Sequence, residues 1–349
     1  MSETAKPLRL LVVRLGAMGD ILHSLPAVTA LRQAHPEWVI GWAIEPQWRG
    51  LFCANGSEPR TPGMPLVDCL HIVPAKQWAR HALSSATWRD MGRVRREVRQ
   101  MGYDVAVEMQ GAVRAAVVAR WARTSRIVGE ANPREWAARW LFNKRVVTRG
   151  AHVIEQSVEV ANAIAGDDLP VPLPLLPRDA AADARAAELP QPLVLLSPGA
   201  GWGAKRWPAV RYGEVARRLA LEGLNVAVNC GPAEERLAHQ ITETSKGAAT
   251  ALQLDMTQLI AVTRRAALVI AGDTGPLHLA CALGKPVVGI FGPTDPARNG
   301  PFHCANRVLR HPESVRDHTR RSEPEAGLLT ITAEDVTAAA LDLLREAGR

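Results

Sequence analysis

The chain has few cysteines and no pattern among them. Cys53, Cys69, Cys230, Cys281 and Cys304 are odd in number, and no two of them form a Cys-x-x-Cys pair. This argues against a disulfide framework and against a structural zinc site. We therefore expect reduced and mostly buried thiols, and a cytoplasmic location.

Long apolar runs are also missing. The first twenty residues hold only a short apolar run, which Arg14 interrupts. No stretch reaches the roughly 20 apolar residues that a membrane-spanning helix needs, and nothing resembles a secretory signal. Low-complexity segments and solenoid-type repeats are absent as well. What is present is a chain of 349 residues with 47% hydrophobic content, long enough for two domains with cores of their own.

Charge is unevenly distributed along the chain. Residues 1–175 hold 22 Lys and Arg against 16 Asp and Glu, whereas residues 176–349 hold 20 against 19. Residues 76–99 and 114–149 supply the excess, and eight of the ten tryptophans lie in the same half. Basic side chains interleaved with Trp suit an anionic partner, either a membrane surface or a nucleic acid. The alternative is a set of solvated basic helix faces above core tryptophans.

The order of apolar segments predicts an α/β fold. Strand-like runs alternate with helical patterns in both halves, which implies parallel sheets that bind ligands at the carboxyl ends of their strands. The predicted strands cover 8–13, 38–44, 103–108, 193–197, 225–229, 268–271 and 287–291. The predicted helices cover 21–34, 87–100, 112–122, 208–221, 233–245, 257–265, 276–283 and 333–346.

A proline-rich segment divides the chain near its middle. Residues 169–177 contain four prolines, which remove N–H donors and fix φ, so we expect an extended linker. We place a first domain at 1–170, the linker at 171–190, a second domain at 191–330 and a C-terminal helix within 331–349. The sequence leaves open whether that helix packs on the first domain.

A first candidate site follows the first predicted strand. The chain there reads Arg14-Leu-Gly-Ala-Met-Gly-Asp20 and then turns into a helix. Gly16-x-x-Gly19 is a glycine-rich turn without the Gly-x-Gly-x-x-Gly spacing of dinucleotide sites. The charge of Asp20 would repel a pyrophosphate, so the residue is better suited as a general base. The alternative is that Asp20 is only a helix N-cap.

A second candidate site lies at residues 272–278. The sequence Gly-Asp-Thr-Gly-Pro-Leu-His directly follows an apolar strand and begins a helix. The free N–H groups at the helix start and the helix dipole favour an anion, here a diphosphate. Thr274 adds a hydroxyl and His278 a ring nitrogen. In the alternative interpretation Asp273 and Thr274 only cap the helix.

A third glycine-rich loop, residues 198–208, reads Pro-Gly-Ala-Gly-Trp-Gly-Ala-Lys-Arg-Trp-Pro. Glycine lets backbone N–H groups approach a phosphate, and Lys205 can add a point charge. Glu235 follows the next strand, where a carboxylate commonly binds ribose hydroxyls. The alternative for Glu235 is a surface position in the first turn of a helix. No Asp-x-Asp triplet is present to hold a divalent ion, so we expect neither a metal nor a bound cofactor.

Taken together, these motifs resemble the ADP-heptose–lipopolysaccharide heptosyltransferases, glycosyltransferase family 9. The resemblance runs from about residue 8 to 302. The matching segments are Met18-Gly-Asp-Ile-Leu-His-Ser-Leu-Pro26, Gln110-Gly111, Pro198-Gly-Ala200, Lys205-Arg-Trp-Pro208, Gly272-Asp-Thr-Gly-Pro-Leu-His278 and Gly292-Pro-Thr-Asp295. The N-terminal half is most like heptosyltransferase I, which adds the first heptose to Kdo, whereas the loop at 198–200 is more like heptosyltransferase II.

The resemblance implies two facing Rossmann-like domains of the GT-B type, with the active site in the interdomain cleft. It implies an inverting transfer of heptose from ADP-heptose, a co-substrate, to the Kdo region of the lipopolysaccharide inner core. Asp20 would be the general base and Lys205 would stabilise the departing diphosphate. The donor-binding residues would be Gly199, Ala200, Gly201, Lys205, Glu235, Leu254, Asp273, Thr274, Gly275 and His278. We expect Asp273 to organise its turn through backbone N–H groups.

On the acceptor side the resemblance implies Arg14, Gly19, His23, Gln110 and Arg114. Basic residues would hold the carboxylates and phosphates of the acceptor. His23 shares a helix face with Asp20 and would either orient the acceptor or serve packing. The expected partners are the nucleotide sugar, a lipid-linked Kdo acceptor and the anionic cytoplasmic face of the bacterial inner membrane, with no nucleic acid. We expect a monomer.

Three rival functions remain at this point. A family member with another acceptor, such as heptosyltransferase II or an enzyme that modifies protein, keeps the fold. A nucleotide-dependent oxidoreductase is disfavoured by the missing dinucleotide fingerprint and by the charge of Asp20. A non-catalytic binder of lipopolysaccharide precursors is disfavoured because both Asp20 and Lys205 are present.

Overall fold

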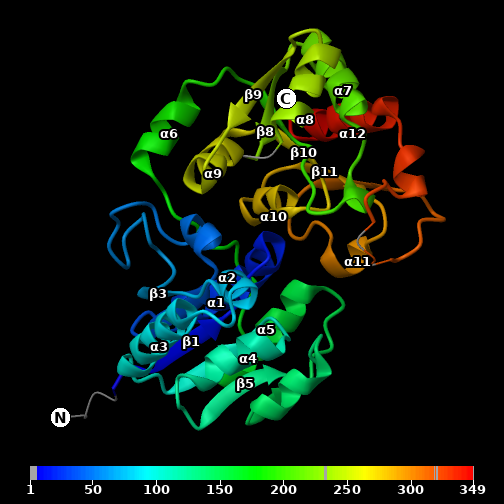
Figure 1. The fold of residues 1–349 in the computed structure, drawn as a ribbon. Coiled ribbons are helices and arrows are strands. Elements are labelled where there is room, and N and C mark those ends of the chain that lie inside the picture. Colours follow the sequence, from blue (N-terminus) through cyan, green and yellow to red (C-terminus); the bar gives the residue numbers. More distant parts are fainter. Residues whose placement is uncertain (1–5, 232–233, 318, 320, 349) are drawn as a thin grey trace. The chain divides into compact units, whose positions relative to one another are not determined.

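The computed structural model describes residues 6–231, 234–317, 319 and 321–348. The chain divides into two compact units, Met1–Pro177 and Arg178–Arg349. Each unit contains one six-stranded parallel sheet with helices around it (Figure 1).

The elements of the first unit follow a strand–helix alternation. They are β1 (Arg9–Val13), α1 (Met18–Ala34), β2 (Val39–Ile44), η1 (Pro46–Leu51), β3 (Cys69–Ile72), α2 (Ala75–Arg80), α3 (Ser85–Gln100), β4 (Val105–Glu108), α4 (Val113–Arg120), β5 (Arg126–Glu130), η2 (Trp136–Leu141), β6 (Lys144–Val146) and α5 (Val153–Ala165), where η marks a 3-10 helix.

The second unit repeats this alternation. Its elements are α6 (Ala180–Ala187), β7 (Leu193–Ser197), η3 (Gly203–Lys205), α7 (Ala209–Leu221), β8 (Asn225–Cys230), α8 (Glu235–Thr244), β9 (Ala249–Gln253), α9 (Met256–Arg265), β10 (Leu268–Gly272), α10 (Gly275–Ala282), β11 (Val287–Phe291), α11 (Pro296–Asn299), β12 (Asn306–Arg310), η4 (Ala326–Leu329) and α12 (Ala333–Glu346).

Both sheets have the same strand order. It is β3-β2-β1-β4-β5-β6 in the first unit and β9-β8-β7-β10-β11-β12 in the second, and the neighbouring strands run parallel. The chain builds one side of each sheet from the centre outward and then returns to build the other side. In such doubly wound sheets the point where the order reverses is the usual ligand site. That point lies between β1 and β4 in the first unit, and between β7 and β10 in the second.

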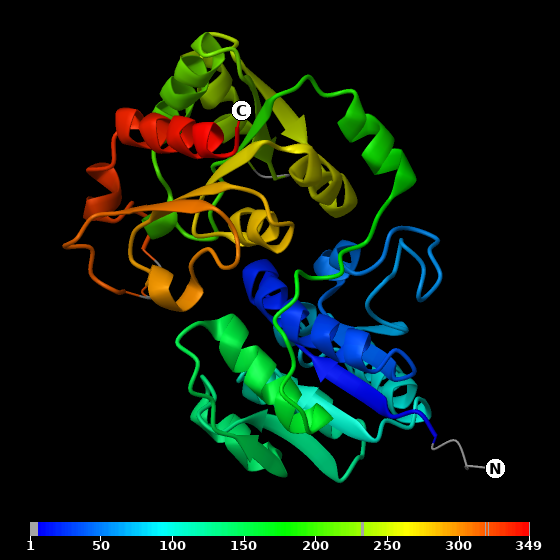
Figure 2. The same ribbon diagram turned by 180° about the vertical axis from the view of Figure 1, so that it is seen from behind.

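The central strands are apolar on both faces because helices cover both faces. β1 reads RLLVV with its last four residues buried, and all five residues of β7 are buried. Continuous apolar runs are typical of parallel strands. In the first unit α3, α4 and η2 share one core with the sheet, on the side that Figure 1 shows. α1 and α5 pack against each other, and Figure 2 shows them from the opposite side.

One segment differs from what the sequence suggests, and the structure places another that the sequence leaves open. Residues 180–187 form helix α6 inside the stretch 171–190, where an extended linker is predicted. This stretch is rich in alanine, and Asp179 caps the helix by accepting from the N–H of Ala182 at 3.0 Å. The C-terminal helix α12, whose location the sequence leaves open, packs in the second unit against α7, β11 and β12.

Candidate functional site

Most of the residues that the sequence singles out lie near the two switch points, the places where the strand order of each sheet reverses. Val13, the last residue of β1, pairs with Glu108, the last residue of β4. The segments that follow these two strands therefore begin side by side. In the second unit Ser197 of β7 pairs with Ala271 of β10, which places the loop 198–205 next to the turn that begins at residue 272. Each unit thus has a candidate site at the carboxyl edge of its own sheet.

Asp20 lies in the first turn of α1 and is held by two contacts. Its Oδ2 accepts from the backbone N–H of Ala17 at 3.2 Å, and its Oδ1 lies 3.3 Å from Nη2 of Arg14. The side chain of Asp20 is 42% exposed, whereas that of Arg14 is 14% exposed. Ala17 is the N-cap and Asp20 the third helical residue, so Asp20 is not the N-cap itself, and its bond to the Ala17 N–H is the capping-box contact of α1. The carboxylate is oriented and also open to solvent, as a base that meets a substrate must be.

Glu108 and Gln110 connect the segments after β1 and β4. The two carboxylate oxygens of Glu108 accept from the backbone N–H groups of Gln110 and Gly111, at 2.8 and 2.9 Å. The side-chain oxygen of Gln110 accepts from the N–H of Leu15 at 2.9 Å. Both side chains are buried. The turn after β4 is therefore fixed to the loop that carries Arg14.

Glu108 is a buried carboxyl that titrates in the neutral range. Burial raises its pKa from 4.5 to about 7, although the backbone donors and the charge of Arg14 act in the opposite direction. Its protonation changes the electrostatic field at Arg14, the residue that orients Asp20. A carboxyl with this property at a ligand-binding edge is a candidate functional residue.

Three buried donors near this edge have no acceptor among the described residues. They are Nε of Arg14, Nε2 of Gln110 and Nε1 of Trp48. Trp48 of η1 lies against the loop after β1, because a Cβ added to Gly16 would come within 2.9 Å of its Nε1. A buried donor without a partner costs free energy, which an oxygen-rich ligand can recover. This set suits an acceptor with carboxylate and hydroxyl groups.

The other acceptor-side candidates lie on neighbouring helices. Gly19 is half-buried in the first turn of α1, and Arg114 is exposed in the first turn of α4. His23 is only 7% exposed, and its ring stands edge-on to His152 with centroids 5.6 Å apart. His23 therefore packs against the residue that caps α5, and its role toward the acceptor stays a prediction.

Lys205 and Asp273 form an ion pair at the second switch point. Nζ of Lys205 lies 2.5 Å from Oδ2 and 3.4 Å from the backbone oxygen of Asp273. It also lies over the ring of Trp202, 5.3 Å from the centroid. The side chains of Lys205 and Asp273 are only 16% and 5% exposed. An ammonium carries three N–H donors, so the two directed at Asp273 leave a third for a ligand anion.

Asp273 also binds His278 of helix α10. Its Oδ1 lies 3.1 Å from Nε2 of the ring. Burial raises the pKa of this carboxyl, but His278 and Lys205 together outweigh burial and hold the pKa well below its usual value of 3.8. The carboxylate is ionised, so Nε2 of His278 carries the proton. The prediction that Asp273 organises its turn through backbone N–H groups needs correction, because the carboxylate fixes two side chains.

A glutamate that the sequence did not single out lies against the glycine loop. Glu234 accepts from the N–H of Gly231 at 2.8 Å, and a Cβ added to Gly199 would come within 2.2 Å of its carboxylate. Glu235, predicted to bind ribose, is exposed in the first turn of α8, with Oε1 3.4 Å from Nε2 of Gln253. Two adjacent carboxylates therefore follow β8, and Glu234 is the one in contact with the loop.

The remaining donor-side candidates lie at the same edge of the sheet. Ala200 and Gly201 are in the loop after β7, and Leu254 directly follows β9. Gly275 begins α10, and Thr274 is its N-cap without a side-chain cap bond. The Thr274 hydroxyl instead donates to the backbone oxygen of Gly272 at 3.3 Å. Thr274 therefore occupies the N-cap position without a side-chain capping bond, and Asp273 makes side-chain contacts beyond any capping role.

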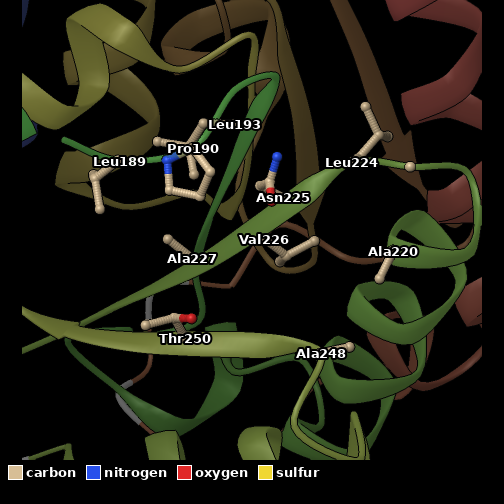
Figure 3. A pocket seen from close by; sticks show the side chains of 11 residues that line it. Leu189, Pro190, Leu193, Ala220, Leu224, Asn225, Val226, Ala227, Ala248 and Thr250 are labelled. Atoms are coloured by element: carbon tan, nitrogen blue, oxygen red, sulfur yellow. The ribbon is translucent and has the colours of Figure 1, made fainter. Parts of the chain in front are cut away.

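A pocket of about 400 Å³ lies elsewhere in the second unit (Figure 3). Leu193 and Asn225 are the first residues of β7 and β8, and Thr250 is the second residue of β9, so the pocket lies at the amino edge of the sheet. No charged side chain lines it. Because it lies at the edge of the sheet opposite to Lys205 and the N-terminus of α10, the pocket is not part of the candidate site described above.

Among the described residues, no group of three or more His, Cys, Asp or Glu is placed to hold a metal ion. The described part of the chain likewise contains no helix long and apolar enough to cross a membrane.

Sequence reasoning also missed Glu108 and Trp48. For Glu108 a signal exists, since one charged residue ends an otherwise apolar strand and is followed by Gln110-Gly111.

Comparison with known proteins gives consistent matches. A family model described as glycosyltransferase family 9 (heptosyltransferase) matches residues 91–328. Lipopolysaccharide heptosyltransferase 1 of Pseudomonas aeruginosa is 28% identical over 313 residues, which cover 84% of this chain and 81% of that protein.

Two solved structures show the same fold. The Escherichia coli heptosyltransferase WaaC with ADP has a TM-score of 0.79 at 24% identity, over 96% of this chain and 100% of that one. The E. coli ADP-heptose LPS heptosyltransferase II has a TM-score of 0.75 at 22% identity, over 98% and 100%. The prediction of two Rossmann-like domains of the GT-B type is thereby confirmed. Because the family model matches well over half of this chain, the chain belongs to glycosyltransferase family 9 and is a heptosyltransferase.

Proposed function

We propose that this enzyme transfers heptose from ADP-heptose to the Kdo region of the lipopolysaccharide inner core. The first unit binds the acceptor and the second binds the donor. The observation that carries the proposal is the different chemistry of the two switch points. One presents an oriented, solvent-accessible carboxylate in Asp20, and the other presents Lys205 beside the N-terminus of α10.

Asp20 acts as the general base. The acceptor hydroxyl gives its proton to the carboxylate as its oxygen forms a bond to the anomeric carbon of the donor. The bond from that carbon to the diphosphate oxygen breaks, and ADP leaves with the electron pair. A single displacement of this kind inverts the anomeric centre. Arg14, with Nη2 at 3.3 Å from Oδ1, holds the carboxylate in its orientation.

The leaving diphosphate is stabilised by charge and by backbone donors. Lys205 supplies the charge, and the N-terminus of α10 supplies N–H groups and its dipole. Asp273 positions both Lys205 and His278 for this purpose. Glu235 is proposed to bind the ribose, and Leu254 to contact the adenine through its backbone.

The first unit favours an acidic acceptor. Kdo carries a carboxylate, whereas a heptose acceptor does not. Arg14 and the unpartnered donors of Gln110 and Trp48 suit that carboxylate. The second candidate is an acceptor that already carries a heptose, which the glycine loop at 198–200 supports. Because the acceptor is lipid-linked, we place the reaction at the cytoplasmic face of the inner membrane.

Mass spectrometry with two acceptors tests the proposal. Purified enzyme with ADP-heptose should add one heptose to Kdo-lipid A. Transfer to heptosylated Kdo-lipid A alone would favour the second candidate, and transfer to neither would refute both.

Asp20→Asn tests the base. The variant keeps the side-chain shape and should lose activity by about 100-fold or more while its ADP affinity is unchanged. Asp167→Asn, at an exposed carboxylate of the same unit, is the matched control. Near-normal turnover of the Asp20 variant would remove it from the mechanism.

A further inference from the structure

Two tryptophans that the reaction does not use are exposed on the first unit. Trp136 and Trp140 of η2 are 61% and 65% exposed, and their rings form a T-shaped pair with centroids 5.6 Å apart. The guanidinium of Arg139 lies 5.7 Å from the ring centre of Trp136, and that of Arg145 lies 5.8 Å from the ring centre of Trp140. We call these four residues the Trp136–Trp140 surface. Clustered exposed aromatics of this kind mark interaction sites.

The backbone beneath this surface is firmly packed. Ala138 is fully buried between the two tryptophans in the sequence, and Phe142 is 5% exposed at the end of η2. The Phe142 ring lies directly on β5, because a Cβ added to Gly129 would come within 2.5 Å of it. The two indoles are therefore presented by a docked corner of the fold.

η2 is also joined to the turn of the acceptor site. The N–H of Glu135 donates to the backbone oxygen of Gly111 at 2.7 Å, and Oε2 of Glu135 accepts from the N–H of Val113 at 2.9 Å. Gly111 has φ +64°, and a Cβ there would come within 2.7 Å of the backbone nitrogen of Arg134. The same glycine donates to Glu108. The surface is thus connected by direct bonds to the turn that holds Gln110.

The charge around the surface has one sign. Residues 134–149 contain five basic residues and one acidic residue. Lys and Arg are attracted to anionic lipid headgroups, and Trp prefers the level of those headgroups. A nucleic acid is a poorer fit, since an arginine lies over one face of each indole, where it competes with a stacking base. A second copy is a poorer fit as well, because a twofold contact would oppose the same positive charges.

We propose that the Trp136–Trp140 surface docks on an anionic phospholipid bilayer and so brings the acceptor turn to the plane of the lipid-linked acceptor. The value of docking for catalysis rests on the proposed function, whereas docking itself does not. The surface lies within residues 114–149, one of the two basic stretches that the sequence singles out, and the other stretch, residues 76–99, includes most of α3. There Arg93 is already paired with Asp90 and Glu97.

Vesicle flotation of the full-length protein tests the docking. Vesicles of equal parts phosphatidylcholine and phosphatidylglycerol should bind the wild type, and pure phosphatidylcholine should bind it weakly. Trp136→Ala with Trp140→Ala should weaken partition by about tenfold or more, since each indole can bury on the order of 100 Å². Arg139→Gln with Arg145→Gln should weaken it by roughly fivefold for each charge removed.

Trp88→Ala is the matched control. Trp88 is 64% exposed on α3 and should contribute little. An equal loss with Trp88→Ala would overturn the assignment to η2, and equal binding to neutral vesicles would overturn the anionic partner. The double Trp variant could instead bind vesicles normally but lose self-association in sedimentation, or lose binding to a single-stranded oligonucleotide. Either result would identify another partner and also overturn the proposal. Circular dichroism and thermal melting check that each variant folds.

A transfer assay separates this proposal from the proposed function. The double Trp variant should transfer heptose normally to a detergent-dispersed acceptor and more slowly to the same acceptor in anionic vesicles. If neither acceptor is a substrate for the wild type, the proposed function fails while the flotation result stands. If both rates are unchanged and flotation is unchanged, the docking surface is wrong.

Discussion

Replacing Glu108 by Gln should remove a pH-dependent component of stability from the first unit. The carboxyl of Glu108 is 2% exposed, and its pKa lies at about 7 instead of 4.5. Between these two values the folded protein holds a proton that the unfolded chain releases. The stability that Glu108 contributes is therefore fully present below about pH 4.5 and is lost as the pH rises through 7.

The size of this effect follows from the two pKa values. Each tenfold change in proton affinity corresponds to about 1.4 kcal/mol, so the free energy of unfolding should fall by about 3 kcal/mol between pH 4.5 and pH 8. Glutamine cannot ionise, so Glu108→Gln lacks this slope. Its amide would also face one of the backbone N–H groups of Gln110 and Gly111, at a pH-independent cost of about 1.5–3 kcal/mol. The variant should be clearly less stable than the wild type at pH 5 and about equal to it at pH 8.

Urea unfolding followed by tryptophan fluorescence measures this difference. Eight of the ten tryptophans lie in residues 1–175, so the signal reports mainly on the first unit. Glu58→Gln, at an exposed glutamate of the same unit, is the control and should show no pH-dependent gap. A gap between the wild type and Glu108→Gln that stays constant with pH would refute the reasoning. A gap that widens as pH rises would mean that the backbone donors outweigh burial.

Three further outcomes follow from the second unit. Lys205→Ala should reduce donor turnover by about tenfold or more, because it removes a charge that stabilises the leaving diphosphate. Arg206→Ala, at the exposed neighbouring position, is the control and should change donor turnover little. Unchanged donor kinetics of the Lys205 variant would remove Lys205 from the site. Activity should survive EDTA, because Lys205 and the N-terminus of α10 provide the positive field, and a complete loss that magnesium restores would contradict this. Glu235→Gln should weaken ADP binding in calorimetry without changing Tm. Glu234→Gln should lower both the ADP affinity and Tm, because Glu234 also accepts from the N–H of Gly231 and so holds that turn. Unaltered ADP affinity of Glu235→Gln would exclude Glu235 as the ribose ligand.

Most strands inside the two sheets could be predicted from the sequence, whereas the four edge strands and β5, which lies between β4 and β6, could not. β1, β7, β10 and β11 are buried on both faces and therefore read as continuous apolar runs. The five residues of β12, NRVLR, are all half-buried, so the strand has neither an apolar run nor a clear alternation. It owes its conformation to pairing with β11, which is a tertiary effect.

The candidate site was predictable to the level of loops but not of contacts. Lys205 and Asp273 both follow strands that end at one edge of a sheet, so their neighbourhood could be inferred. Their ion pair spans 68 residues and depends on the register between Ser197 and Ala271, which no local pattern encodes. Which of Glu234 and Glu235 contacts the glycine loop depends on the path of the turn between β8 and α8.

The bond from Val113 to Glu135 makes the start of α4 dependent on a residue 22 positions away in the chain. If the corner around η2 opens, the N–H of Val113 loses its acceptor and the N–H of Glu135 loses Gly111 at the same moment. These two amides should therefore exchange hydrogen with solvent at one common free energy of opening, as parts of a single cooperative unit. A bilayer that holds η2 closed would slow the exchange of both, and the turn that receives the acceptor would become more rigid on the membrane than in solution.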